Sequence, residues 1–148
     1  MYTKKVIEHF TNPKNVGFIK NYDGVAISGD QSCGDFLIMT IKIKDNKISD
    51  LKYKVFGCPA SISTASALSV MAIGMNIPDA LKITDDDVVD FLGELPEAKI
   101  HCSLMSVDAL QHCVAYNKFF NAYKDGDPTF TKEKFNKRLN FDFSKYMD

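Results

Sequence analysis

The sequence predicts an α+β domain, in which a short N-terminal helix precedes three strands and several helices follow them. Three patterns support this order. Apolar residues recur with helical spacing near the N-terminus, and apolar and polar residues alternate between residues 36 and 55. After residue 60 the apolar residues return to helical spacing. Because strands and helices are segregated along the chain, an α/β fold with alternating elements is not expected.

The first predicted element is an amphipathic helix from Tyr2 to Phe10. It ends at Thr11-Asn12-Pro13, because proline disfavours the helical conformation in the residue before it. Gly24 to Ser28 is predicted to form a short strand, which leads through a polar loop toward Cys33.

The next two strands form a hairpin. Phe36 to Lys44 and Leu51 to Val55 both alternate between apolar and polar residues, as half-buried strands do. Asp45-Asn46-Lys47 has the composition of a tight turn. The two strands are therefore expected to pair antiparallel around this turn.

The hairpin brings distant residues together at its open end. Residues equally far from the turn face each other in an antiparallel pair. Cys33 and Cys58 lie at nearly equal distances from Asn46, so they are expected to be neighbours, with Asp35 close by. Two thiols and a carboxylate that converge in this way indicate a metal or sulfur site.

Helical segments are predicted over the rest of the chain. Their expected ranges are Ala60 to Ile73 after Pro59, a short start at Asn76 to Leu81, a capped helix from Thr84 to Gly93, and a long helix from about His101 to Tyr123. The long helix is apolar over much of its circumference, which predicts a central position. Residues 131–148 mix charges with aromatic side chains, and this composition leaves both a docked and a flexible tail open.

Size and composition exclude several classes of protein. The chain has 148 residues, enough for one domain with a core that needs no disulfides. A formal net charge of −1 argues against a nucleic-acid-binding protein, which would carry a basic excess. We find no secretory signal and no apolar run long enough to span a membrane, so a cytoplasmic location is expected. Four cysteines in such a chain indicate metal binding or catalysis rather than a disulfide framework.

A third thiol completes the candidate site. Cys102 follows His101, and both Cys58 and Cys102 are predicted to lie at helix N-termini, where the helix dipole favours a thiolate. Together with Cys33 and Asp35 they provide three sulfurs, one nitrogen and one oxygen, one donor more than a tetrahedral ion requires. A surplus donor indicates a site that can exchange its contents. Lys99 is either a solvated charge or a group that orients Cys102.

Each cysteine also has a simpler explanation, because an isolated cysteine is more often a small buried apolar residue than a ligand. Cys113 fits that explanation. It lies about three helical turns beyond Cys102, roughly 16 Å away, so it cannot share a metal with Cys102. We assign Cys113 and its neighbour His112 to packing or to the surface.

The sequence resembles the iron–sulfur cluster assembly scaffold family, the IscU proteins and the N-terminal domain of NifU. The resemblance runs in order from Tyr2 to about Lys124. The segments that carry it are Tyr2 to Phe10, Asn12 to Gly17, Cys33-Gly34-Asp35, Phe56-Gly57-Cys58 and Lys99-Ile100-His101-Cys102-Ser103. It implies a small antiparallel three-stranded sheet with helices packed on one face. It also divides the chain into a scaffold domain, residues 1–125, and a C-terminal charged and aromatic extension, residues 126–148.

The resemblance implies a function and roles for single residues. The function is assembly of [2Fe–2S] clusters from iron and persulfide sulfur, and their transfer to acceptor proteins, by a carrier rather than a turnover enzyme. Cys33, Cys58, His101 and Cys102 match the family's cluster ligands, and Asp35 matches its aspartate associated with cluster lability and with metal binding. All five are thus candidate ligands for iron, or for zinc in the cluster-free form. Cys102 is the expected persulfide acceptor.

The implied partners are a cysteine desulfurase of the IscS or NifS type, iron–sulfur acceptor proteins, a ferredoxin and a frataxin-like protein. Tyr2 matches a tyrosine linked in the family to dimer contacts, so a homodimer is also implied.

Two positions depart from the family. Pro59 replaces a glycine and so removes a backbone N–H that could donate a hydrogen bond to a cluster sulfide. Leu95-Pro96-Glu97-Ala98-Lys99 departs from the family's chaperone-recognition segment, which argues against hand-off to an Hsp70-type chaperone.

Two alternative functions remain. The SufU branch suggests a zinc-bound sulfurtransferase that accepts persulfide without building a cluster, although His101 and the compact spacing favour the IscU and NifU branch. A purely structural zinc domain is weaker, because such sites are closed by four ligands and here a fifth donor is present.

Overall fold

The computed structural model describes residues 2–30 and 35–146 and confirms the α+β class. The elements in chain order are α1 (Lys4–Thr11), β1 (Gly24–Asp30), β2 (Asp35–Lys44), β3 (Lys47–Phe56), α2 (Pro59–Ala72), α3 (Ile77–Ala80), α4 (Asp85–Leu92), the 3₁₀ turn η1 (Glu97–Lys99), α5 (His101–Gly126), α6 (Lys132–Leu139) and the 3₁₀ turn η2 (Ser144–Tyr146). No helix in the described ranges is long and apolar enough to cross a membrane.

The three strands form one antiparallel sheet in the order β1-β2-β3. The predicted hairpin register is confirmed, because Phe36 is opposite Phe56 and Lys42 is opposite Asp50. The turn is tighter than predicted. Asp45 and Asn46 have φ values of 53° and 60°, the conformation of a two-residue type I′ turn, so β3 already begins at Lys47.

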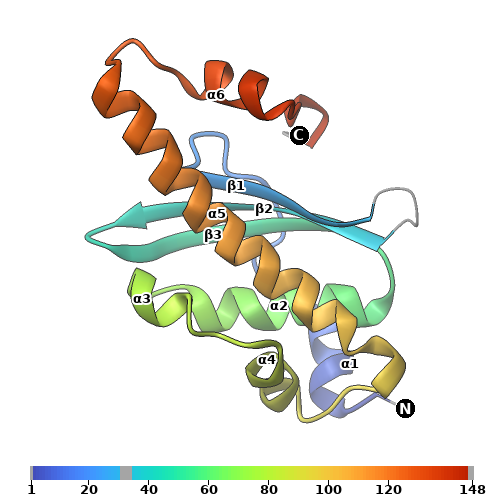
Figure 1. Cartoon of the computed structure of the whole chain (residues 1–148). Helices are drawn as coiled ribbons and strands as arrows, with labels where there is room; N and C mark the ends of the chain where they lie inside the picture. Colours follow the sequence, from blue (N-terminus) through green and yellow to red (C-terminus); the bar gives the residue numbers. More distant parts are fainter. Residues whose placement is uncertain (1, 31–34, 147–148) are drawn as a thin grey trace.

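One face of the sheet carries the main core. Leu37, Met39 and Ile41 of β2 point to this face and are fully buried. Figure 1 shows α1, α2, α3 and α4 on this side, while α5 runs diagonally across the sheet. Their starts follow the predicted caps: α2 begins with Pro59 after Cys58, and Thr84 forms a capping box with Asp87 at α4. Helix α1 starts later than predicted, at Lys4, because the Thr3 side chain accepts a hydrogen bond from the N–H of Val6.

Helix α5 takes the predicted central position, packed against β1, β2 and α2. Its approach to β1 depends on a glycine. A Cβ atom at Gly24 would lie 2.1 Å from the carbonyl oxygen of Cys113, so no other residue fits without moving α5. This contact sets the distance between α5 and the sheet. It thereby helps to position the residues at the N-terminal end of α5.

The C-terminal segment is docked rather than flexible as far as Tyr146. It supplies Phe130, Phe135, Phe143 and Tyr146 to a second buried cluster. The sheet contributes Val25 and Ile38 to this cluster, and α5 contributes Tyr116 and Phe120. Ile38 lies on the opposite face of β2 from Leu37 and Met39, because successive strand residues alternate. The extension therefore adds a cover to the second face of the sheet, visible as α6 above the strands in Figure 1.

Candidate metal and sulfur site

The candidate site lies where the open end of the β2–β3 hairpin meets the first residues of α2 and α5. The Sγ atoms of Cys58 and Cys102 are 3.8 Å apart. The Nε2 atom of His101 is 3.6 Å from the Sγ of Cys102. Cys102 is almost fully buried, Cys58 is half-buried and His101 is exposed. The structure thus brings together three of the five predicted donors directly.

Asp35 joins this group across Gly57. A Cβ atom at Gly57 would lie only 2.5 Å from the Oδ1 atom of Asp35 and 2.7 Å from the hydroxyl of Ser61. The glycine of Phe56-Gly57-Cys58 lets the carboxylate and the hydroxyl approach the backbone beside Cys58, and a larger residue there would displace both groups. The predicted proximity of Asp35 to the site is confirmed.

Cys33, the fifth predicted donor, lies outside the described residues. Its place opposite Cys58 and its role as a ligand remain predictions. Within residues 2–30 and 35–146, no three His, Cys, Asp or Glu side chains are already arranged closely enough to hold a metal ion. A shared ion therefore needs Cys33, or a small movement of Asp35 or His101 toward the two thiols.

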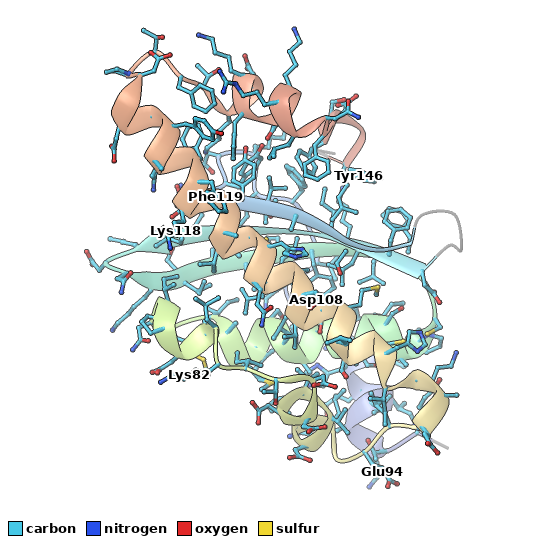
Figure 2. The ribbon with its side chains drawn as sticks, viewed as in Figure 1. Lys82, Glu94, Asp108, Lys118, Phe119 and Tyr146 are labelled. Carbon is cyan, nitrogen blue, oxygen red and sulfur yellow. The ribbon has the colours of Figure 1, made fainter. Side chains whose placement is uncertain are left out.

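A cavity of about 320 Å³ opens beside Cys102. Asp35, His101 and Cys102 line it together with Asp108, one and a half turns further along α5. Figure 2 labels Asp108 on α5. The remaining lining comes from Ser28, Gly29, Leu104 and Met105. The site is thus open to solvent and small ligands on the side of α5, where two carboxylates line the cavity.

The two thiols differ in their tendency to ionise. Burial raises the pKa of Cys58, but hydrogen bonds from the N–H and hydroxyl of Ser61, the Cys102 thiol and the positive charge of Lys99 outweigh it. The pKa of Cys58 therefore lies below its ordinary value. Burial, the charge of Cys58 and its hydrogen bond, and then Asp35 raise the pKa of Cys102 to about 12. Of the two thiols, Cys58 therefore ionises at the lower pH.

The helix-terminus argument thus holds for Cys58 and not for Cys102. Cys58 is the N-cap residue of α2, and its carbonyl accepts hydrogen bonds from the N–H groups of Ser61 and Ile62. Helix α5, by contrast, continues from η1 through Ile100, whose backbone is already helical, and the N–H of Ser103 is bonded to the Ile100 carbonyl. At Cys102, burial together with Cys58 and Asp35 outweighs the positive charge of Lys99, so its thiol keeps its proton to a higher pH than the thiol of Cys58.

This difference predicts the order in which the thiols react in the metal-free protein. Because the thiolate is the nucleophile, alkylation of Cys58 by iodoacetamide is expected to rise at a lower pH than that of an ordinary cysteine. Alkylation of Cys102 is expected to keep rising toward pH 12. Peptide mapping across a pH series measures both rates. Equal pH profiles for the two cysteines would contradict this order of ionisation.

Ser61 was not anticipated from the sequence. It stands three residues after the N-cap residue Cys58, the position from which a side chain reaches back to the start of a helix. Its hydroxyl also donates to the Cys58 carbonyl at 2.7 Å. This spacing is the signal that would have identified it. Lys99, whose role was left open, lowers the pKa of both thiols and so acts on the site.

Cys113 and His112 lie away from the site, as predicted. The Cys113 side chain is fully buried, and its thiol donates to the carbonyl oxygen of Met39. His112 is exposed on α5 and lines a different cavity, beside β1. Cys113 is therefore a packing residue.

The fold and this site define a member of a known family. Residues 1–122 match the family model described as the NifU-like N terminal domain. The chain belongs to this family, which confirms the resemblance drawn from the cysteine motifs.

Individual relatives support the assignment. The chain is 49% identical over 114 residues to the iron–sulfur cluster assembly scaffold protein IscU 1 of Archaeoglobus fulgidus, an alignment that covers 77% of this chain and 74% of the relative. It is 43% identical over 116 residues to the nitrogen fixation protein NifU of Azotobacter chroococcum, covering 77% of this chain but only 38% of NifU. This chain thus corresponds to less than half of that longer protein.

A solved structure shows the same fold. The crystal structure of a nitrogen-fixing NifU-like protein (N-terminal) from Brucella abortus superposes with a TM-score of 0.62 at 20% identity. The superposition covers 79% of this chain and 94% of the other. About a fifth of this chain therefore has no counterpart there, and the family match ends before the extension begins.

Proposed function

We propose that this protein is a scaffold on which [2Fe–2S] clusters are assembled from iron and desulfurase-derived persulfide sulfur, and from which they pass to acceptor proteins. Homology to cluster assembly scaffold proteins supports the class. The spacing of the two thiols is the observation that carries the proposal. Two thiolates that bind one tetrahedral ion at about 2.3 Å each lie about 3.8 Å apart. The Cys58–Cys102 separation is 3.8 Å.

The donors around this pair have distinct roles in the proposal. Cys33, Cys58 and Cys102 supply soft sulfur ligands, and His101 supplies a nitrogen ligand of intermediate softness. Asp35 supplies a hard oxygen, which binds iron less strongly and is the easiest donor to displace. Because the donors outnumber the four positions of a tetrahedral ion, one of them can leave while the others hold. A site of this kind suits a protein that binds a cluster and later transfers it to an acceptor.

Sulfur enters in the proposal through Cys102. Its thiolate attacks the outer sulfur of a cysteine persulfide on the desulfurase, so that a new S–S bond forms at Cys102 and the donor cysteine leaves as a thiolate. The Cys102 thiol must first lose its proton. His101, with Nε2 at 3.6 Å, is the nearest base to accept it. The chain acts as a carrier in this scheme, since it ends the cycle by giving up what it received.

The partners in the proposal are those that the family resemblance implies. A cysteine desulfurase delivers sulfur, a ferredoxin supplies electrons, and a frataxin-like protein takes part in assembly. Apo iron–sulfur proteins accept the finished cluster. Tyr2 packs half-buried against the main core, and the homodimer remains a prediction.

One observation also favours a second candidate, a zinc-bound sulfurtransferase. The 3.8 Å thiol separation fits zinc as well as iron, and Cys58, Cys102 and His101 are all ligands that zinc accepts. In that function persulfide would pass through Cys102 without cluster formation. Tight zinc binding, stimulation of a desulfurase and no cluster would support it.

Anaerobic reconstitution distinguishes the two candidates. The metal-free protein with all cysteines reduced is incubated with ferrous iron, cysteine and a cysteine desulfurase. The scaffold proposal expects visible charge-transfer absorption, and recovery of the absorbing species on an apo-ferredoxin added afterwards. A colourless protein that has nevertheless accepted persulfide would overturn the scaffold function.

A further inference from the structure

We propose that the C-terminal extension positions the assembly site through Tyr146, which therefore acts as a positioning residue outside the part of the chain that matches the family. The inference rests on the proposed function, because it concerns the same site. It follows from the packing of aromatic side chains on the far face of the sheet, next to the two strand ends that lead to Asp35 and Cys58.

The strand ends present different residues to the two faces of the sheet. Asp35 points toward the face that carries Cys102, where it lines the cavity. Phe36, the next residue, points to the opposite face because side chains alternate along a strand. On β3 the same alternation places Phe56 opposite Phe36, directly before Gly57 and Cys58. Each donor is thus one or two residues from a phenylalanine on the far face.

These phenylalanines form an aromatic group with Tyr146. The rings of Phe36 and Phe56 are stacked with centroids 4.7 Å apart and planes 15° from parallel. The Tyr146 ring lies across both, with its centroid 6.3 Å from Phe36 and 6.0 Å from Phe56. Tyr146 is 6% exposed, whereas Phe56 remains 42% exposed. Among the described residues, the tyrosine thus covers one side of the stacked pair.

The backbone of the extension is also fixed at this point. Lys54 of β3 donates from Nζ to the carbonyl oxygen of Tyr146 at 2.9 Å. Figure 2 shows Tyr146 between the C-terminal segment and the sheet. Further back, the hydroxyl of Tyr116 on α5 donates to Asn136 of α6, and Asn136 donates to the hydroxyl of Tyr22. The C-terminal segment is thus bonded to the rest of the fold at both α6 and η2. Its η2 turn packs against the open end of the β2–β3 hairpin.

The aromatic group keeps the ends of β2 and β3 together beside the site. The open end of a hairpin has no turn to hold its strands together, and its last pairs separate most easily. A stacked pair covered by a third ring opposes this separation from the face away from the metal. Removal of the Tyr146 ring should let residues 35–36 and 56–58 move apart more often, and so expose Cys58.

The test is the alkylation rate of Cys58 in the metal-free full-length protein, followed by peptide mapping at fixed pH. Tyr146→Ala is expected to raise this rate about fivefold, which corresponds to about 1 kcal/mol, the contribution of an aromatic contact of this geometry. Tyr146→Phe keeps the ring and is expected to react as the parent does. Tyr146→Leu keeps apolar volume without the ring and should give a smaller rise, which serves if the alanine variant folds poorly.

Phe130→Ala is the matched control. Phe130 is also 6% exposed and belongs to the same buried cluster, but its ring contacts are with Phe120, Tyr123 and Phe135 at the far end of the extension. It should lower the melting temperature as Tyr146→Ala does, without the fivefold rise at Cys58. An equal rise in both variants would overturn the positioning role in favour of general destabilisation. So would a Tyr146→Ala protein with the parent rate.

The reconstituted protein gives a second readout, in which Tyr146→Ala should shorten the cluster lifetime relative to Phe130→Ala. The two proposals can fail separately. If the parent protein forms no cluster, the scaffold function fails, while the alkylation result on metal-free protein still decides the role of Tyr146. If the parent forms a cluster and the alkylation rates are unchanged, only the role of Tyr146 fails.

Discussion

Replacement of Cys102 with serine is expected to abolish persulfide capture while some metal binding remains. The serine keeps the size of the side chain but cannot form the S–S bond, whereas Cys58 and His101 still supply ligands. The measurement is transfer of ³⁵S from labelled cysteine through a cysteine desulfurase to the protein on a non-reducing gel. We expect the label to fall to the background of the desulfurase alone.

Cys113→Ser is the control for this experiment, because Cys113 is buried between α5 and β2 and lies outside the site. It should carry as much label as the parent. A persistent label on the Cys102→Ser protein would contradict the assignment. The acceptor would then be another cysteine, Cys58 or Cys33, and of the two described thiols at the site Cys58 has the lower pKa.

Replacement of Asp35 with alanine is expected to lengthen the lifetime of the bound cluster. The carboxylate is the hardest donor near the site, and its loss leaves sulfur and nitrogen ligands that hold iron more firmly. We expect the half-life of the visible absorption after reconstitution to increase about tenfold, as a change of ~1.4 kcal/mol in the barrier to release produces. Transfer to an apo-ferredoxin should slow by a similar factor.

Asp108→Ala separates the role of Asp35 from a general effect of charge. Asp108 lines the same cavity, but it lies beyond Met105 on α5 rather than beside Gly57. Its removal should leave the cluster lifetime close to that of the parent. If Asp35→Ala loses its cluster as fast as the parent or faster, Asp35 is not the labile donor.

The hairpin and the helix starts could be predicted from the sequence because local patterns determine them. The position of the turn predicted the register of β2 and β3, and this register correctly placed Asp35 near Cys58. Pro59 and Thr84 each marked the start of a helix. Such features depend on residues close in sequence, or on a single turn.

The ionisation of the two thiols could not be predicted in this way. Both cysteines were expected to benefit from a helix N-terminus. The outcome at Cys102 depends instead on burial and on the neighbouring Cys58 and Asp35, which come from distant parts of the chain. A sequence shows where helices begin, but it does not show how deeply a side chain is buried.

The docking of the extension could not be predicted either. Its charges favour solvent and its aromatic residues favour burial, so composition alone is compatible with both states. The structure resolves this through partners that no local pattern reveals, such as Asn136 with Tyr22 and Tyr116, and Tyr146 with Phe36 and Phe56.

The most direct test of the site is anomalous diffraction from crystals of the protein loaded anaerobically with zinc or reconstituted with iron and sulfide. We expect the anomalous peak at the open end of the hairpin, within about 2.3 Å of the Sγ atoms of both Cys58 and Cys102. Cys33 should approach the same metal. A metal bound elsewhere, with the Cys58 and Cys102 thiols free, would contradict the assignment of this site and the scaffold function that depends on it.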